Sequence, residues 1–180
     1  MYEVEMKLRA DHEAVAAELD RLDAAHRGSF EQADVYFSAP HRDFAARDEA
    51  LRLREETGAE GSESVLTYKG PRLEGDSKVR TEHETEIEAP EELTATLEAL
   101  GFESAATVEK KRERYALDSV TVTLDAVSGL GEFVEIEARV KEGGLEHARE
   151  VVEKTAKRLG LEPAEQIETS YLELLLENGG

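Results

Sequence analysis

The 180-residue chain contains no cysteine, which excludes disulfides, thiolate metal sites and thiol nucleophiles and favours a reducing compartment. It also has no long apolar run, since its longest runs, such as Leu174-Leu175-Leu176, are far too short to span a bilayer. The first strand pattern begins at residue 3 and leaves no room ahead of it for a signal peptide. These absences predict a soluble cytoplasmic protein with no membrane partner.

Positive charge is scarce. The chain has 22 Lys and Arg residues against 42 Asp and Glu residues, and its formal net charge is −20. A surface this negative repels phosphate backbones, so nucleic acid is not expected as a partner. Two explanations of the charge stay open. We favour a halophilic surface suited to a salt-rich cytoplasm, and the alternative is simple solubility.

Several common catalytic motifs are also missing. No Gly-x-x-x-x-Gly-Lys-Ser/Thr phosphate loop occurs, and Gly129-Leu130-Gly131 lacks the third glycine of a dinucleotide fingerprint. His12-Glu13 is not followed by the second histidine of a zinc-binding helix, and no histidine falls into a defensible Ser/His/Asp order. Metal-assisted phosphoryl or nucleotidyl transfer is the chemistry that these exclusions leave.

Charged residues alternate with apolar ones at the start of the chain. As a β-strand, the stretch from Glu3 to Arg9 places Glu3, Glu5, Lys7 and Arg9 on one face and Val4, Met6 and Leu8 on the other. For one strand alone, the simplest interpretation is a polar face that meets water. The same pattern recurs later, however, with like charges two residues apart at Arg52 and Arg54, at Lys110 and Arg112, and at Glu135 and Glu137.

Turn signals and hydrophobic periodicity predict eight strands and a few helices in one domain, residues 1–180. The expected strands are 3–9, 33–38, 50–56, 64–69, 78–89, 107–117, 120–126 and 132–140, and the expected helices are 11–25, 90–100, 145–159 and 168–176. We therefore expect an α+β fold in which a mainly antiparallel sheet closes into an eight-stranded barrel. If the charged faces point into the barrel, amphipathic helices must cover the apolar faces outside.

Two acidic pairs are candidate metal ligands. Glu3 and Glu5 would lie roughly 6.5–7 Å apart at their Cα atoms on one strand, close enough for their oxygens to converge on one cation. Magnesium accepts one or two carboxylates and takes further ligands from water and substrate phosphates. Glu135 and Glu137 supply a second pair of the same kind.

The basic residues of the predicted strands are candidate phosphate ligands. Six of them in one cavity would match a polyphosphate better than a monoanion, and they are Arg52, Arg54, Lys69, Arg80, Lys110 and Arg112. The alternative is surface ion pairing with the many nearby acids. We prefer that alternative for Lys78, Lys111, Arg114 and Arg139.

The chain resembles the CYTH superfamily, the triphosphate tunnel metalloenzymes that include class IV adenylyl cyclases and thiamine triphosphatases. The signature E-x-E-x-K stands as Glu3-Val4-Glu5-Met6-Lys7. The resemblance continues through Asp34-Val35-Tyr36-Phe37, Leu51-Arg52-Leu53-Arg54, Thr67-Tyr68-Lys69-Gly70-Pro71, Arg80-Thr81-Glu82, Val108-Glu109-Lys110-Lys111-Arg112, Asp125, Gly131-Glu132-Phe133-Val134-Glu135-Ile136-Glu137 and Ser170-Tyr171-Leu172-Glu173-Leu174-Leu175. It therefore covers nearly the whole chain.

The resemblance implies a tunnel in which Glu3, Glu5, Glu135 and Glu137 bind Mg²⁺ or Mn²⁺ with help from Asp125. It also implies that the six basic residues above hold a triphosphate. The resemblance further implies that Lys7 completes a catalytic set with Glu3, Glu5, Glu135 and Glu137.

The motifs at Asp34-Tyr36-Phe37 and Ser170–Leu175 are closer to the class IV adenylyl cyclase branch, which implies conversion of ATP to cyclic AMP and pyrophosphate. Two alternatives stay open: hydrolysis of thiamine triphosphate, inorganic triphosphate or a nucleoside triphosphate, and binding without turnover. The expected partner is a triphosphate-bearing small molecule, ATP or thiamine triphosphate. A homodimer is compatible with the sequence, which does not fix the oligomeric state.

Overall fold

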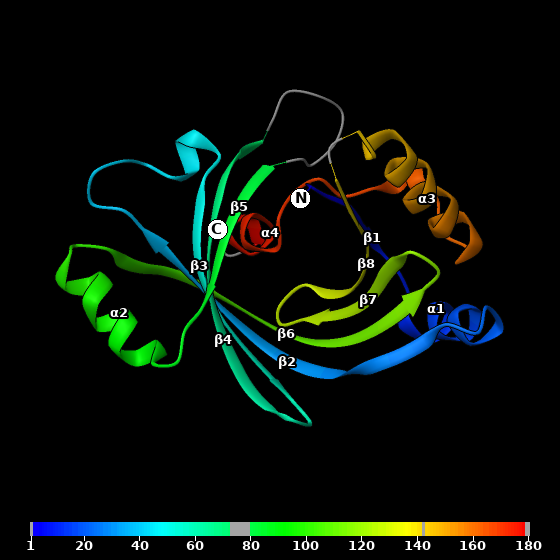
Figure 1. The fold of residues 1–180 in the computed structure, drawn as a ribbon, viewed down its shortest axis with the longest axis horizontal. Coiled ribbons are helices and arrows are strands. Elements are labelled where there is room, and N and C mark those ends of the chain that lie inside the picture. The colour runs from blue at the N-terminus through cyan, green and yellow to red at the C-terminus, as the bar shows by residue number, and fades with distance from the viewer. Residues whose placement is uncertain (1, 73–79, 142, 179–180) are drawn as a thin grey trace.

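The computed structural model describes residues 2–72, 80–141 and 143–178 (Figure 1). Its strands are β1 (Tyr2–Arg9), β2 (Ala25–Ser38), β3 (Ala50–Gly58), β4 (Gly61–Arg72), β5 (Arg80–Glu86), β6 (Glu103–Leu117), β7 (Val120–Val127) and β8 (Gly131–Val140). Its helices are α1 (His12–Arg21), α2 (Pro90–Ala99), α3 (Leu145–Arg158) and α4 (Tyr171–Asn178), with short 3₁₀ turns η1 (Ala45–Arg47) and η2 (Pro163–Glu165).

The strands form one sheet in the order β1-β8-β7-β6-β2-β3-β4-β5, and every neighbouring pair is antiparallel. The sheet curls into a half-barrel (Figure 1). This confirms the predicted α+β fold with eight antiparallel strands. The two edge strands, β1 and β5, lie close to each other, but no ladder joins them in the described part of the chain. The structure is thus a half-barrel rather than a barrel closed by continuous pairing.

The two faces of the sheet separate charge from hydrocarbon, as the alternation predicts. In the β1–β8 ladder Lys7 lies opposite Glu135, and Glu5 lies opposite Glu137. The charged side chains of the two strands therefore lie next to each other on one face of the sheet. The intervening apolar residues face the other way and pack against the helices α1 and α3. This convex core consists of Val4, Met6, Leu8, Leu117, Val120, Val122, Leu124, Val134, Ile136 and Ala138 from the sheet with Val15, Leu19, Ala148, Val152, Ala156 and Leu159 from α1, α3 and the residue after α3.

The helix α4 differs from α1 and α3 because it lies on the concave side of the sheet, at the centre of Figure 1. Its first residue, Tyr171, joins a second apolar cluster with Val108, Val127, Leu130 and Phe133. Val108 lies two residues before Lys110 and therefore shares its face of β6. The concave face is apolar at this end, and α4 keeps that part of it from water.

The strand β2 starts at Ala25, whereas the sequence analysis expected the strand to begin at residue 33 and the preceding helix to reach residue 25. The helix α1 ends at Arg21. Gly28, which lies between the expected helix and the expected strand, has a φ of +128° and lies at a register shift of the β2–β6 ladder. A bulge at a residue without Cβ lets the strand continue where local signals indicated a stop.

Across residues 2–72, 80–141 and 143–178, none of the helices is both long enough and apolar enough to cross a membrane.

The convex core makes a prediction about stability. Leu19 is fully buried, so Leu19→Ala should lower the free energy of unfolding by about 2–5 kcal/mol, through lost hydrocarbon burial and a residual cavity. Leu100 is 65% exposed, and Leu100→Ala is the matched control, with an expected change within about 0.5 kcal/mol. Chemical denaturation measures both, and equal losses would contradict this account of the core.

Candidate active site

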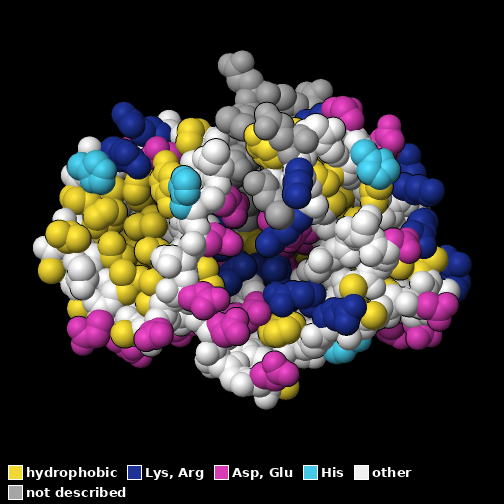
Figure 2. All heavy atoms as spheres, viewed as in Figure 1, with side chains coloured by type: hydrophobic (Ala, Val, Ile, Leu, Met, Phe, Trp, Pro, Cys, Tyr) yellow, Lys and Arg dark blue, Asp and Glu magenta, His cyan; other side chains and the backbone are white. Residues whose placement is uncertain are grey.

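The concave face encloses a cavity of about 830 Å³. Figure 2 shows the hollow near the middle of one face, with Lys, Arg, Asp and Glu side chains gathered around it. The predicted site residues that line it are Glu3, Glu5, Lys7, Arg52, Arg54, Lys69, Lys110, Arg112, Glu135 and Glu137. Side chains from β1, β3, β4, β6 and β8 thus meet in one space.

Two predicted residues stand apart from this lining. Asp125 on β7 is fully buried and lies behind Arg112 rather than on the cavity wall. Arg80 is the first residue of β5, but its side chain lies outside the described part of the structure.

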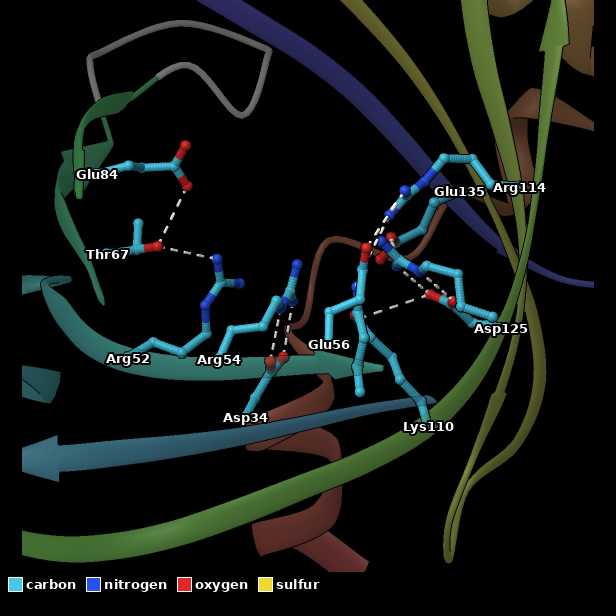
Figure 3. A network of polar contacts seen from close by, with 12 residues as sticks. Asp34, Arg52, Arg54, Glu56, Thr67, Glu84, Lys110, Arg114, Asp125 and Glu135 are labelled. Carbon is cyan, nitrogen blue, oxygen red and sulfur yellow. Dashed lines mark hydrogen bonds and ion pairs between the residues drawn. The ribbon is translucent and has the colours of Figure 1, made fainter. Parts of the chain in front are cut away.

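The deepest part of the site is a network around Arg112. Its guanidinium donates to both oxygens of Asp125, at 2.7 and 2.5 Å, and to Glu135 at 2.7 Å. Burial alone would raise the pKa of Glu135, but Arg112, Lys110 and Lys7 together hold it well below its usual range. Glu135 is therefore ionised. Figure 3 shows Glu135, Lys110 and Asp125 pointing toward one another from their separate strands.

Tyr171 connects this network to the two lysines. Its hydroxyl donates to Asp125 at 3.0 Å, and the ammonium groups of Lys7 and Lys110 lie 4.4 and 5.0 Å from its ring centroid. Burial and the neighbouring Arg112 lower the pKa of Lys110 from 10.5 to about 8. In the sequence, the only signal of a role for Tyr171 is its place in the motif Ser170–Leu175. Its hydroxyl and its ring thus contact three charged residues of the site, Asp125, Lys7 and Lys110.

A second arginine is fixed in the same way. Arg54 donates to both oxygens of Asp34, at 2.6 and 2.7 Å, and Asp34 is only 2% exposed (Figure 3). Burial alone would raise the pKa of Asp34, but the hydrogen bonds and charge of Arg54 lower it from 3.8 to about 2. Asp34 also lacked a predicted role, although it belongs to the motif Asp34-Val35-Tyr36-Phe37.

Arg52 differs from Arg54 and Arg112 because it forms no ion pair with a carboxylate in the described residues. It is buried, and its Nη2 donates to the hydroxyl of Thr67 at 3.2 Å, which in turn donates to Glu84 at 3.1 Å (Figure 3). Its Nε has no hydrogen-bond partner in the described part of the chain. A buried donor without a partner is costly, so this guanidinium is suited to an incoming anion.

Carboxylates crowd together where β1 approaches β5. Burial, together with the charges of Glu137, Glu5 and Glu82, raises the pKa of Glu3 from 4.5 to about 8. Lys69 pairs with Glu82 at 2.6 Å, and Arg139 pairs with Glu137 at 2.6 Å and with Glu3 at 3.6 Å. The carboxylates in this part of the cavity outnumber the two cations, Lys69 and Arg139, that pair with them.

The expected ion pairs of the residues assigned to surface pairing also form. Arg139 has the partners given above, Lys111 lies 3.7 Å from Glu31, and Arg114 lies 3.0 Å from Glu56. This confirms that expectation for Lys111 and Arg114. Arg139 forms ion pairs as expected, but it lines the cavity and its partners are the predicted metal ligands Glu3 and Glu137, so it is part of the site. Lys78 lies outside the described residues.

The acidic group around Glu3 fits a hard divalent cation, because its donors are all oxygens and their mutual repulsion would be relieved by positive charge. In the described residues, no group of three or more His, Asp or Glu side chains stands close enough to hold a metal ion by itself. Magnesium commonly uses one or two carboxylates and completes its ligands with water and phosphate oxygens. A magnesium ion here would therefore take one or two of the predicted ligands Glu3, Glu5, Glu135 and Glu137 and complete its shell with water and phosphate oxygens.

Comparison with known proteins places this geometry in a family. The CYTH domain matches residues 1–171. A Methanocaldococcus jannaschii protein named as a candidate adenylate cyclase is 36% identical over 180 residues, with 97% of this chain and 98% of that protein covered. The adenylate cyclase CyaB of Aeromonas hydrophila is 28% identical over 179 residues, with 98% and 89% covered.

Solved structures of proteins with the same fold are also similar to this chain. The PH1819 protein of Pyrococcus horikoshii OT3 superposes with a TM-score of 0.90 at 40% identity, covering 97% of this chain and 98% of that chain. A candidate adenylyl cyclase of Hippeastrum, described as having a dominant triphosphatase activity, has a TM-score of 0.73 at 22% identity, with 98% and 95% covered. This second likeness shows the fold alone.

The chain therefore belongs to the CYTH domain family. Members of this family are adenylyl cyclases or triphosphatases, bind triphosphate substrates such as ATP, and generally depend on a divalent metal.

The pairing of Asp34 with Arg54 predicts a pH dependence. Because the pKa of Asp34 is lower in the folded protein, its contribution to stability is complete above about pH 4 and is lost as the pH falls toward 2. Over that window wild type should lose roughly 2 kcal/mol more than Asp34→Asn. Denaturant titrations at several pH values measure this difference. Asp20→Asn, at an exposed position of α1, is the control and should follow wild type.

Proposed function

We propose that this chain is a divalent-metal-dependent enzyme of the class IV adenylyl cyclase type, converting ATP to cyclic AMP and pyrophosphate. The observation that carries the proposal is the single cavity into which Arg52, Arg54, Lys110 and Arg112 project beside the carboxylates of β1 and β8. The similarity to proteins named adenylate cyclases along nearly the whole chain supports the same reaction.

The basic residues would bind the triphosphate. A guanidinium group can donate two parallel hydrogen bonds to phosphate oxygens. Bidentate hydrogen bonds to Asp34 fix the guanidinium of Arg54, and bidentate hydrogen bonds to Asp125 fix that of Arg112. We assign Asp125 to this positioning in place of its predicted metal role, because Arg112 and Tyr171 occupy its oxygens and it does not line the cavity. Lys69 and Arg80 complete the predicted set of phosphate ligands.

The carboxylates Glu3, Glu5, Glu135 and Glu137 would hold Mg²⁺ or Mn²⁺. When bound, the ion would neutralise phosphate charge and increase the electrophilicity of phosphorus. Lys7 and Lys110 lie over Tyr171, where Lys110 is nearly fully buried, so their charges act in a site of low solvent exposure.

In the cyclase reaction the ribose 3′-hydroxyl attacks the α-phosphorus, the new O–P bond forms, and the bond to the bridging oxygen of the β-phosphate breaks. The hydroxyl proton is released and pyrophosphate leaves. Negative charge moves onto the leaving group in this step, and the fixed guanidinium groups of Arg54 and Arg112 would stabilise it there without reorientation.

Hydrolysis is the second candidate, because the same cradle would serve water attacking the γ-phosphorus. The activity described for the Hippeastrum protein, which shares the fold, favours keeping this candidate. Its substrate would be thiamine triphosphate, inorganic triphosphate or a nucleoside triphosphate.

Product analysis tests the proposal. The protein is incubated with ATP and Mg²⁺ or Mn²⁺ in high KCl, and the products are separated by chromatography. Cyclic AMP with pyrophosphate supports the cyclase. Orthophosphate in their place supports a hydrolase, and binding without turnover at any metal concentration supports a non-catalytic sensor.

Arg52 offers a clean test of triphosphate binding. Its removal leaves no carboxylate of the described residues unpaired, so Arg52→Ala should lower affinity for ATP by about 10- to 100-fold with little loss of fold. Isothermal titration calorimetry measures the affinity. Arg21→Ala, at a largely exposed position of α1, is the matched control and should bind as wild type does. Unchanged affinity in Arg52→Ala would remove this residue from the cradle.

A further inference from the structure

One arginine of the cavity, Arg139, pairs with carboxylates to which a different partner has been assigned above. Its Nε donates to Glu137 at 2.6 Å, and its Nη2 lies 3.6 Å from Glu3. Both glutamates are predicted ligands of the divalent ion. The guanidinium of Arg139 therefore contacts oxygens that the ion would also use.

The backbone of the β1–β8 ladder produces this contact. Arg139 lies directly opposite Glu3 in the ladder, and Glu137 precedes it by two residues on β8, so all three side chains share the concave face. From this position a long side chain reaches one carboxylate on its own strand and one on the neighbouring strand. The register that gathers acids for a cation thus also supplies a cation from the chain itself.

Arg139 is held less firmly than the arginines deeper in the cavity. Its side chain is 62% exposed, whereas that of Arg54 is 19% exposed and that of Arg112 is 10% exposed. Arg54 and Arg112 each form bidentate hydrogen bonds with a buried aspartate, and Arg139 forms no such pair within the described residues. Because water can solvate an exposed guanidinium, Arg139 can leave its two glutamates at little cost.

The guanidinium and a divalent ion are alternative partners for these glutamates. Glu3 is surrounded by other carboxylates, and positive charge relieves their mutual repulsion. A guanidinium brings one charge, whereas magnesium brings two and approaches its oxygen ligands to about 2.1 Å. Both cations on the same carboxylates would repel each other at short range, so binding of one disfavours the other.

We propose that Arg139 competes with the divalent ion for Glu3 and Glu137, leaving these carboxylates when the ion binds and returning to them when the ion dissociates. The inference rests on the proposed function, since it takes the two glutamates as ligands of the ion. Arg139 thereby lowers the affinity of the site for the ion and sets the metal concentration at which the site fills.

Titration with Mn²⁺ tests this competition, with unbound Mn²⁺ measured by its electron paramagnetic resonance signal at constant ionic strength and without ATP. Arg139→Gln removes the competing cation and should bind Mn²⁺ about tenfold more tightly than wild type. Arg139→Lys retains the charge and should lie closer to wild type than Arg139→Gln does.

Arg42→Gln is the matched control. Arg42 also lines the cavity, but it pairs with Glu49 at 2.9 Å, and Glu49 is not a predicted ligand of the ion. This variant removes the same charge without releasing a predicted ligand, so its affinity for Mn²⁺ should match that of wild type. The inference is overturned if Arg139→Gln binds Mn²⁺ as wild type does, or if Arg42→Gln gains as much affinity.

NMR detects the displacement itself. The Nε–H resonance of Arg139 is assigned by its absence from spectra of Arg139→Lys, and Mg²⁺ is added to concentrations that displace bound Mn²⁺. Loss of the hydrogen bond to Glu137 should shift this resonance toward the position of exposed arginines. An unchanged resonance overturns the inference and leaves the proposed function standing. If wild type binds neither ion, with or without ATP, both the inference and the proposed function fail.

Discussion

The structure depends on the pairing of buried cations with buried carboxylates across the concave face of the sheet. An isolated charge in such a space is prohibitively costly, whereas a paired and hydrogen-bonded charge is tolerated. Arg54 is held by Asp34, and Arg112 is held by Asp125 and Glu135, each through bonds of 2.5–2.7 Å. These pairs let a sheet bury charge on one side while α1 and α3 bury hydrocarbon on the other.

The pairing is uneven, and this unevenness explains how the site could bind two ligands of opposite sign. Near Arg52 a buried guanidinium lacks a carboxylate partner among the described residues, so an anion is favoured there. Near Glu3 several carboxylates raise one another's energy, as the raised pKa of Glu3 indicates, so a cation is favoured there. A metal and a polyphosphate bound together would offset both imbalances, whereas either one alone would correct only half.

Much of this was predictable because a strand has a strict period of two. Alternation alone placed Glu3, Glu5 and Lys7 on one face, and the antiparallel ladder then set Glu135 and Glu137 beside them. Other features depend on contacts between distant segments. Tyr171 has no charge and lies on a helix, so no local pattern indicates that it reaches Asp125 across 46 positions. The start of β2 is a second example, because the residues between the expected helix and the expected strand pair with β6 from Ala25 onward.

The arrangement also separates two functions that evolution can change independently. Arg54 and Arg112 are fixed by acids on neighbouring strands, whereas Phe44, Ala45 and Leu172 reach the cavity from the β2–β3 connection and from α4. Substitutions in a connection or a terminal helix leave the strand ladders intact, because the ladders are held by the backbone and by the convex core. The charged wall of the cavity can therefore stay constant while the residues that line its other end differ among proteins of this fold.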